Sequence, residues 1–217
     1  GRRIVGGELP PGTGLTLAGL EETFSASRTV VREVVRVLEA HGLLTSRRRV
    51  GLVVRPREEW DILNADIIEW SLDSPSRRDV LIELTELRIA VEPVAARLAA
   101  ERASAPVRDE LLRFATLLSD LGGQGLGDST EYLEADIAYH RLLLTASGNP
   151  LFVKLSEPIA EILRGRAVRG LTPGMPRVGT LEAHLATAQA IFDGRGADAE
   201  ASAREHLTLV SDEVVEG

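Results

Sequence analysis

Cysteine is absent from this chain of 217 residues. Its absence excludes disulfide bonds and thiolate metal ligands, so any bound metal must be held by nitrogen and oxygen atoms. The sequence also lacks an apolar run of roughly eighteen residues and a signal-peptide pattern, which predicts a cytoplasmic protein with no membrane partner. A content of 44% apolar and 27% charged residues suits one large or two small globular domains with a buried core.

Charge is divided unevenly along the chain. Residues 1–57 carry ten arginines, no lysine and five glutamates, so their net charge is +5. The net charge of the whole chain is −8, so the remaining residues together carry −13. A protein with this overall charge would repel nucleic acid as a whole, and only a localised basic patch could bind it. The N-terminal segment supplies such a patch.

The basic segment has the pattern of a helix, a turn, a second helix and a hairpin. A short helix is expected at residues 15–24, and Ser27 is a good N-cap for a second helix at residues 28–41, which Gly42 ends. The expected buried stripe of the second helix consists of Val31, Val34, Val35 and Leu38. Residues 43–54 are rich in β-branched side chains and predict two short strands around an arginine-rich tip.

Together these elements predict a winged helix-turn-helix. In that geometry the second helix lies in the major groove, where its N-terminal residues reach base edges and other cations contact phosphate. The alternative is an arginine face that is only solvated, which is the usual fate of an isolated charge run. Because the arginines are concentrated on a recognisable docking shape, the sequence favours DNA binding.

Three motifs of this segment resemble the winged-helix signature of GntR-type bacterial regulators: residues 7–12 (GELPPG), 27–33 (SRTVVRE) and 41–44 (HGLL). Two departures from that signature stand at Leu17-Ala18-Gly19, where the family often has charged residues, and at Arg49-Val50-Gly51, where a closer match has two glycines. The resemblance implies that operator DNA is contacted by Ser27, Arg28, Thr29 and Arg32 and, in the minor groove, by the wing-tip residues Arg48 and Arg49.

The rest of the chain is expected to be helical. Residues 58–76 form a connector, in which Trp60 and Trp70 could pack onto the next domain. From Arg77 onward the helical pattern is broken five times by Gly, Pro or Asn, giving about six helices, a count typical of an antiparallel bundle. The predicted fold is therefore mainly α, with a winged helix-turn-helix domain at 1–57, the connector at 58–76 and a helical bundle domain at 77–217.

Three of the four histidines fall at core-facing positions of these predicted helices. Asp136 and His140 share one inward stripe at a spacing of four residues, which puts their Cβ atoms roughly 6 Å apart. His184 and His206 take equivalent positions in two later helices. A buried histidine needs a partner. Either each histidine has its own carbonyl or acid, or the three meet Asp136 at one metal ion, and their number favours the metal.

Arg88 is the one cation in an apolar stripe of the first bundle helix. A buried arginine requires a carboxylate or phosphate in close contact. Glu92, one turn further on, could be that partner, and an exogenous acid is the alternative. The sequence alone leaves both open.

Arg88 with Glu92, residues 136–140 (DIAYH), the turn at Gly148 and the two later histidines resemble the FCD effector domain of the FadR subfamily of GntR regulators. Members similar to this chain hold a divalent metal with one aspartate and three histidines and bind a small carboxylate beside it. The resemblance implies that Asp136, His140, His184 and His206 are the metal ligands and that Arg88 faces the effector. Nitrogen–oxygen ligation suits zinc, nickel, manganese or iron.

The sequence therefore predicts a transcriptional regulator, most simply a repressor, which acts as a homodimer on palindromic double-stranded operator DNA. A small carboxylate effector, either a hydroxy acid or a sugar acid, is expected to control its affinity. The connector resembles that of galactonate-responsive regulators, which makes an aldonic acid the first candidate. A metal-dependent hydrolase or lyase is the enzymatic alternative, although Glu131 and Glu134 lie off the stripe and leave no general base beside the site. A purely structural metal is the other alternative.

Overall fold

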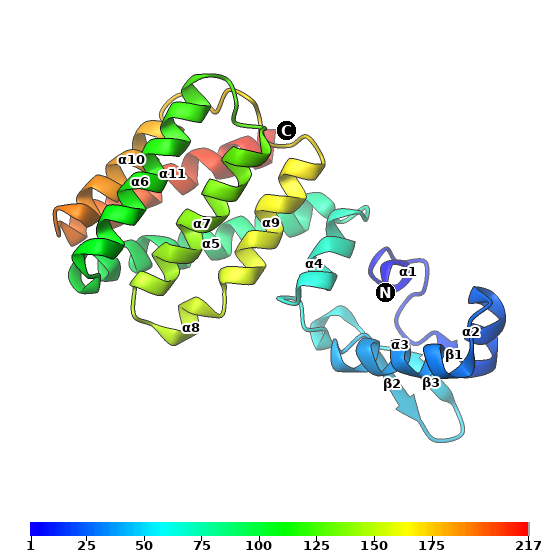
Figure 1. Cartoon of the computed structure of the whole chain (residues 1–217). Helices are drawn as coiled ribbons and strands as arrows, with labels where there is room; N and C mark the ends of the chain where they lie inside the picture. The colour runs from blue at the N-terminus through cyan, green and yellow to red at the C-terminus, as the bar shows by residue number, and fades with distance from the viewer. Residues whose placement is uncertain (217) are drawn as a thin grey trace. The chain divides into compact units, whose positions relative to one another are not determined.

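The computed structural model describes residues 1–216, which form two compact units divided at Arg77 (Figure 1). The first unit combines short helices with a small sheet, and the regular elements described in the second are all helices. None of the described helices has the length and apolarity needed to cross a membrane. The predicted class, mainly α with an N-terminal winged helix-turn-helix and a C-terminal helical domain, is confirmed.

The elements of the first unit, in chain order, are α1 (Arg2–Val5), β1 (Gly14–Leu15), α2 (Leu17–Phe24), α3 (Arg28–Ala40), β2 (Leu44–Arg47), β3 (Gly51–Val54), a 3-10 helix (Arg57–Glu59) and α4 (Ala65–Leu72). The three strands form an antiparallel sheet in the order β1-β3-β2. Leu44 pairs with Val54 and Gly14 with Val53. The hairpin of β2 and β3 is the predicted wing, whereas the sequence did not predict β1.

Local hydrogen bonds fix both ends of α3. The Ser27 hydroxyl accepts a hydrogen bond from the Val30 backbone N–H at 3.4 Å, as expected of an N-cap. After the C-terminal end, Gly42 has a φ of +77°, and a Cβ built there would lie 2.3 Å from the Glu59 carbonyl oxygen. A glycine is therefore required at this turn, because the conformation and the space both exclude a side chain.

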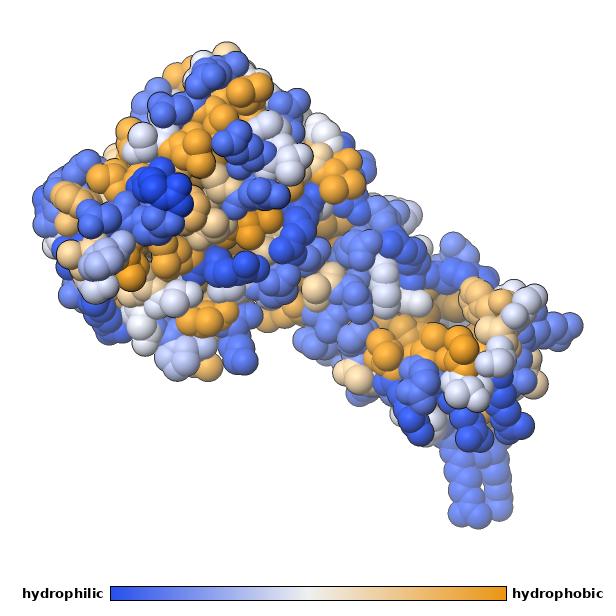
Figure 2. Space-filling view, viewed as in Figure 1, coloured by the Kyte–Doolittle hydropathy of each residue, from blue (hydrophilic) through white to orange (hydrophobic). Residues whose placement is uncertain are grey.

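The buried face of α3 differs from the prediction at one position. Val31, Val35 and Leu38 are buried, but Val34 is 49% exposed. Val34 borders an apolar hollow of about 490 Å³ in the surface of the first unit, and Figure 2 shows apolar side chains gathered on this unit. The residues expected to connect the domains also contribute here, since Ile67 is in the core of the first unit and Trp60 and Trp70 pack against it.

In the described residues of the second unit, six long helices and one short one form a bundle. They are α5 (Arg77–Arg102), α6 (Ala105–Gly123), α7 (Thr130–Ala146), α8 (Pro150–Val153), α9 (Ser156–Val168), α10 (Thr180–Phe192) and α11 (Gly196–Glu216). α10 packs against α6 and α11, and α7 packs against α6 and α9 (Figure 1). Helices far apart in the sequence therefore share one core.

Among the helices that bring polar side chains into that core are α5 and α7. α5 is continuous through Pro93, and both Arg88 and Glu92 on its inner face are buried. α7 buries Tyr139 and His140, while Asp136 is partly exposed at the edge of the same face.

Candidate metal centre and nucleic-acid interface

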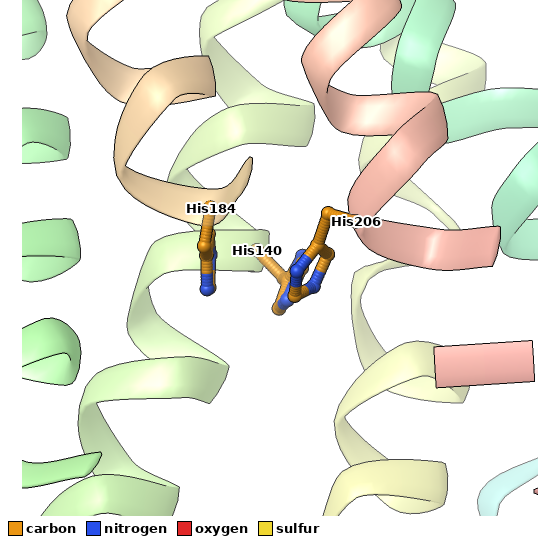
Figure 3. A group of neighbouring side chains, drawn as sticks. All are labelled: His140, His184 and His206. Atoms are coloured by element: carbon orange, nitrogen blue, oxygen red, sulfur yellow. The ribbon is translucent and has the colours of Figure 1, made fainter. Parts of the chain in front are cut away.

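Three histidines from three different helices converge in the core of the second unit. His140 comes from α7, His184 from α10 and His206 from α11, and their rings lie next to one another (Figure 3). One ring nitrogen of each lies within 4.8 Å of those of the other two, and all three residues are buried. Such a cluster offers the neutral nitrogen ligands that divalent transition metals prefer.

The hydrogen bonds of two of these rings leave nitrogens suited to a metal. His206 Nδ1 lies 3.2 Å from the Thr180 carbonyl oxygen, so Nδ1 carries the hydrogen and donates it, and Nε2 keeps a free lone pair. His184 Nε2 is buried with no hydrogen-bond partner among the described residues. A buried polar atom without a partner is costly, so the donor set of this structure fits a metal ion.

The electrostatic surroundings keep the same two histidines neutral. Burial lowers the pKa of His206 to about 4, and the nearby His140 and Arg88 act in the same direction. Burial also lowers the pKa of His184 well below its ordinary value, with His206 and His140 adding to the effect. A neutral imidazole is the form that binds a metal.

His140 lies between two carboxylates. Its Nδ1 is 2.8 Å from Glu92 Oε2, and its Nε2 is 3.2 Å from Asp136 Oδ1. Burial by itself would raise the pKa of each acid, but Arg88 beside Glu92 and His140 beside Asp136 hold both pKa values well below the usual range. Both groups are therefore carboxylates at neutral pH. Asp136 contacts His140 and thereby adjoins the three-histidine cluster.

Two of the three guanidinium nitrogens of Arg88 contact other protein groups. Its Nε donates to Glu92 Oε1 at 2.7 Å, and its Nη2 lies 3.0 Å from His140 Nε2. Burial would lower the pKa of Arg88, but the charge of Glu92 outweighs it and the net shift is upward. Of the two partners that the sequence left open for this cation, the structure contains Glu92.

A small cavity borders the cluster. Its volume is about 50 Å³, and Arg88, Asp136, His140 and His206 contribute to its wall. Water needs roughly 10–15 Å³ by this measure, so the space accepts an ion and a few waters. A larger molecule would require a side chain of the wall to move.

Further polar residues of this wall were not singled out from the sequence. They are Tyr132, Arg166, Thr172, Thr180 and Glu213. Arg166 follows Ile159 and Ile162 on the buried face of α9 and is itself buried. The criterion that identified Arg88, a cation within an apolar helical stripe, would therefore have found Arg166 as well.

The predicted DNA-contacting residues lie on the surface of the first unit. Ser27, Arg28, Thr29 and Arg32 are exposed at the start of α3. Arg48 and Arg49 are exposed in the turn between β2 and β3, whose tip is hydrophilic in Figure 2. Arg49 has a φ of +66°, a left-handed conformation in which glycine is preferred. This position is one of the two where the chain departs from the GntR signature.

Comparison with known proteins finds a matching family for each of the two units. Residues 1–54 match the family described as bacterial regulatory proteins, gntR family, and residues 83–209 match the FCD domain. The galactonate operon transcriptional repressor of Escherichia coli K12 is 34% identical over 97% of this chain and 90% of its own length. The regulator LutR of Bacillus subtilis is 32% identical over 96% of this chain and 94% of its own length.

A solved structure supports the same fold. Streptococcus agalactiae GntR has a TM-score of 0.56 and 24% identity, with 96% of this chain and 93% of that chain covered. These relatives are regulators and not hydrolases or lyases, so the enzymatic alternative is not supported. The chain belongs to the GntR family of bacterial transcriptional regulators and carries an FCD domain behind its winged helix-turn-helix.

Proposed function

We propose that this protein is a repressor whose operator affinity is controlled by a hydroxy acid or sugar acid bound beside a divalent metal in the helical unit. The convergence of His140, His184 and His206 is the observation that carries the proposal. Their separation in sequence makes a shared centre the simplest reason for three buried imidazoles to meet.

In this proposal Asp136 and the three histidines hold the metal. Asp136 Oδ1 lies close enough to His140 Nε2 for both atoms to bind the same ion, and Asp136 supplies a negative charge. When bound, a divalent ion attracts the oxygen atoms of an acid. Tyr139 supports the cluster, since its ring lies edge-on to His184 with centroids 4.2 Å apart.

The effector class rests on the relatives and on the chemistry of the cavity wall. One relative is named as the repressor of a galactonate operon. Galactonate is an aldonic acid, with one carboxylate and several hydroxyl groups. Arg88 and Arg166 are the guanidinium groups of the wall, and Thr180 offers a hydroxyl group. In this proposal Arg88 faces the effector, as the resemblance to the FCD domain implies.

On the DNA side, α3 is proposed to enter the major groove with Arg28, Thr29 and Arg32, while Arg48 and Arg49 reach the minor groove. Ser27 holds the first turn of α3 in place. A homodimer would place two such units on a palindromic operator. The effector can act only by binding the DNA-competent and the DNA-incompetent arrangements with different affinity.

The test is a titration of operator affinity in the metal-loaded full chain. Duplexes selected by the protein from random-sequence DNA serve as operator, and fluorescence anisotropy reports the Kd. Galactonate is expected to weaken binding by roughly 5–150-fold, the usual range of allosteric coupling. Galactitol, which lacks the carboxylate, should have no effect.

His184→Ala should abolish both metal binding and the response to galactonate. Gln189→Ala, at an exposed position of the same helix, is the matched control. If chelation lowers the melting temperature but neither galactonate nor other hydroxy acids change DNA affinity, the metal is structural only and the sensor function is refuted.

A further inference from the structure

Two buried guanidinium groups border the cavity beside the histidines, and their environments differ. Arg88 is held by a strong contact, since Glu92 accepts from Nε at 2.7 Å and both residues are almost completely buried. Breaking this buried pair would leave a buried charge without compensation. An incoming carboxylate would have to compete with Glu92 for Arg88 and would separate Arg88 from His140.

Arg166, on α9, is held more weakly. Its Nη2 lies 3.3 Å from Glu213 Oε2 and 3.4 Å from the Leu171 carbonyl oxygen. Charge-assisted hydrogen bonds of this type are usually 2.7–2.9 Å long. Burial lowers the pKa of Arg166, with Arg88 adding to the effect. A carboxylate that approached Arg166 more closely would therefore be strongly favoured.

Glu213, on α11, is the group that such a carboxylate would replace. Its side chain lines the cavity and is 19% exposed. The carboxylate can therefore be solvated by water when the side chain rotates away from Arg166. Replacement would also enlarge a cavity that is only about 50 Å³ in volume. Thr180 stands in the same wall, and its buried hydroxyl has no hydrogen-bond partner among the described residues. A ligand with a hydroxyl group near its carboxylate would supply that partner.

We propose that Arg166 is the residue that binds the carboxylate of the effector, and that Glu213 occupies the place of this carboxylate until the ligand displaces it. The ligand class is a hydroxycarboxylate, because a hydroxyl group near the carboxylate would form a hydrogen bond with the Thr180 hydroxyl in the same wall. Arg88, to which the family resemblance gives the effector-facing role, acts instead as a positioning residue, which holds Glu92 and His140 in place. The inference rests on the proposed function only for the biological role of the ligand.

Displacement of Glu213 has a consequence for the segment between α9 and α10. Glu213 Oε1 also accepts a hydrogen bond from the Arg177 backbone N–H at 3.2 Å. In the ligand-free state, Glu213 thus links α11 both to α9, through Arg166, and to residues 170–179. Ligand binding breaks this link, which connects occupancy of the cavity to the structure of a surface segment of the unit.

The experiment measures Kd for glycolate and galactonate by titration calorimetry on the metal-loaded full chain, with galactitol as the neutral control. Arg166→Gln is expected to weaken both acids by about 10-fold or more, the weight of one charge-assisted hydrogen bond. Glu213→Gln is expected to tighten both acids, since the competing charge is gone. Arg164→Gln, at a partly exposed position of α9, should leave both Kd values unchanged.

Metal content and melting temperature are recorded for every variant, and Arg166→Lys serves if Arg166→Gln does not fold. Lysine keeps the charge but not the planar fork of donors, so it should retain part of the affinity. Arg166→Gln with wild-type Kd values and normal metal content would overturn the inference. So would the absence of any carboxylate binding in Glu213→Gln. Carboxylate binding that depends on Arg166 without any change in DNA affinity would instead sustain this inference and refute the proposed function.

Discussion

Glu92 Oε2 on α5 lies 2.8 Å from His140 Nδ1 on α7, and both side chains are buried. A carboxylate in this position accepts the hydrogen of Nδ1, so it fixes the tautomer and the orientation of the imidazole. His140 Nε2 is thereby directed toward the side on which Asp136 lies. Glu92 thus belongs to the candidate metal centre without being one of its expected ligands.

Glu92→Gln is expected to weaken metal binding by roughly 10–100-fold, because partners of ligating histidines typically have effects of this size. The free energy of unfolding should also fall by about 3 kcal/mol, since Arg88 loses its buried counter-charge. Competitive metal titration and urea denaturation measure the two effects. Glu101→Gln, which alters an exposed pair with Arg97, is the control and should change stability by less than about 0.5 kcal/mol. Unchanged metal affinity in Glu92→Gln would show that Glu92 does not support metal binding.

The stability of the metal-free protein should depend on pH through His206. Its folded-state pKa of about 4 lies below the ordinary value of 6.5, so between these values the unfolded chain takes up more protons than the folded one. The free energy of unfolding is therefore expected to fall as the pH falls from about 6.5 to 4, by up to roughly 3 kcal/mol for this group. Above pH 6.5 His206 contributes no further change.

The contribution of His140 to the pH dependence of stability has to be distinguished from that of His206. Burial would lower its pKa, but Glu92 outweighs burial and the net shift is upward, so its linkage has the opposite sign. The comparison is therefore between the wild type and His206→Asn, each measured by urea denaturation across the pH range. If both proteins lose stability with the same slope below pH 6.5, His206 is not the group responsible.

The periodicity of the sequence was enough to place individual side chains on the inner faces of helices. A spacing of 3.6 residues per turn assigns His140, His184 and His206 to inner faces, and all three are buried. Which helices are neighbours depends on packing that periodicity does not encode. The sequence therefore offered only a chemical reason to expect the three rings to be close: buried histidines need partners, and a shared metal ion would serve all three.

Two details depended on three-dimensional packing. Val34 was predicted to be buried because it is three residues from Val31, but the core of the first unit covers only the side of α3 with Val31, Val35 and Leu38. Glu213 belongs to the inner face of α11, seven residues after His206. Its contact with Arg166 joins two helices, and a single-helix pattern could not reveal it.

Arg32 is expected to read the operator, in contrast to Arg36 one turn later. Arg36 is paired with Glu33 at 2.7 Å, whereas Arg32 has no ion-pair partner among the described residues and is exposed. Arg32→Ala should weaken operator binding by about 1–3 kcal/mol and reduce discrimination between operator and random DNA. Arg36→Ala should have a smaller effect. Anisotropy titrations with operator and scrambled duplexes test both, and equal losses on the two duplexes would assign Arg32 to phosphate contact.

Arg49 in the wing is expected to lower the stability of the fold and to raise the affinity for DNA. Its φ of +66° is unfavourable for a residue with a side chain, so Arg49→Gly should leave the free energy of unfolding unchanged or raise it by up to about 1 kcal/mol. The same change should weaken DNA binding and reduce the slope of log K against log salt by about 1, because one phosphate or minor-groove cation is lost. Arg49→Lys, which keeps the charge, should preserve the slope. A salt slope that stays the same in Arg49→Gly would show that the wing tip does not contact DNA through this residue.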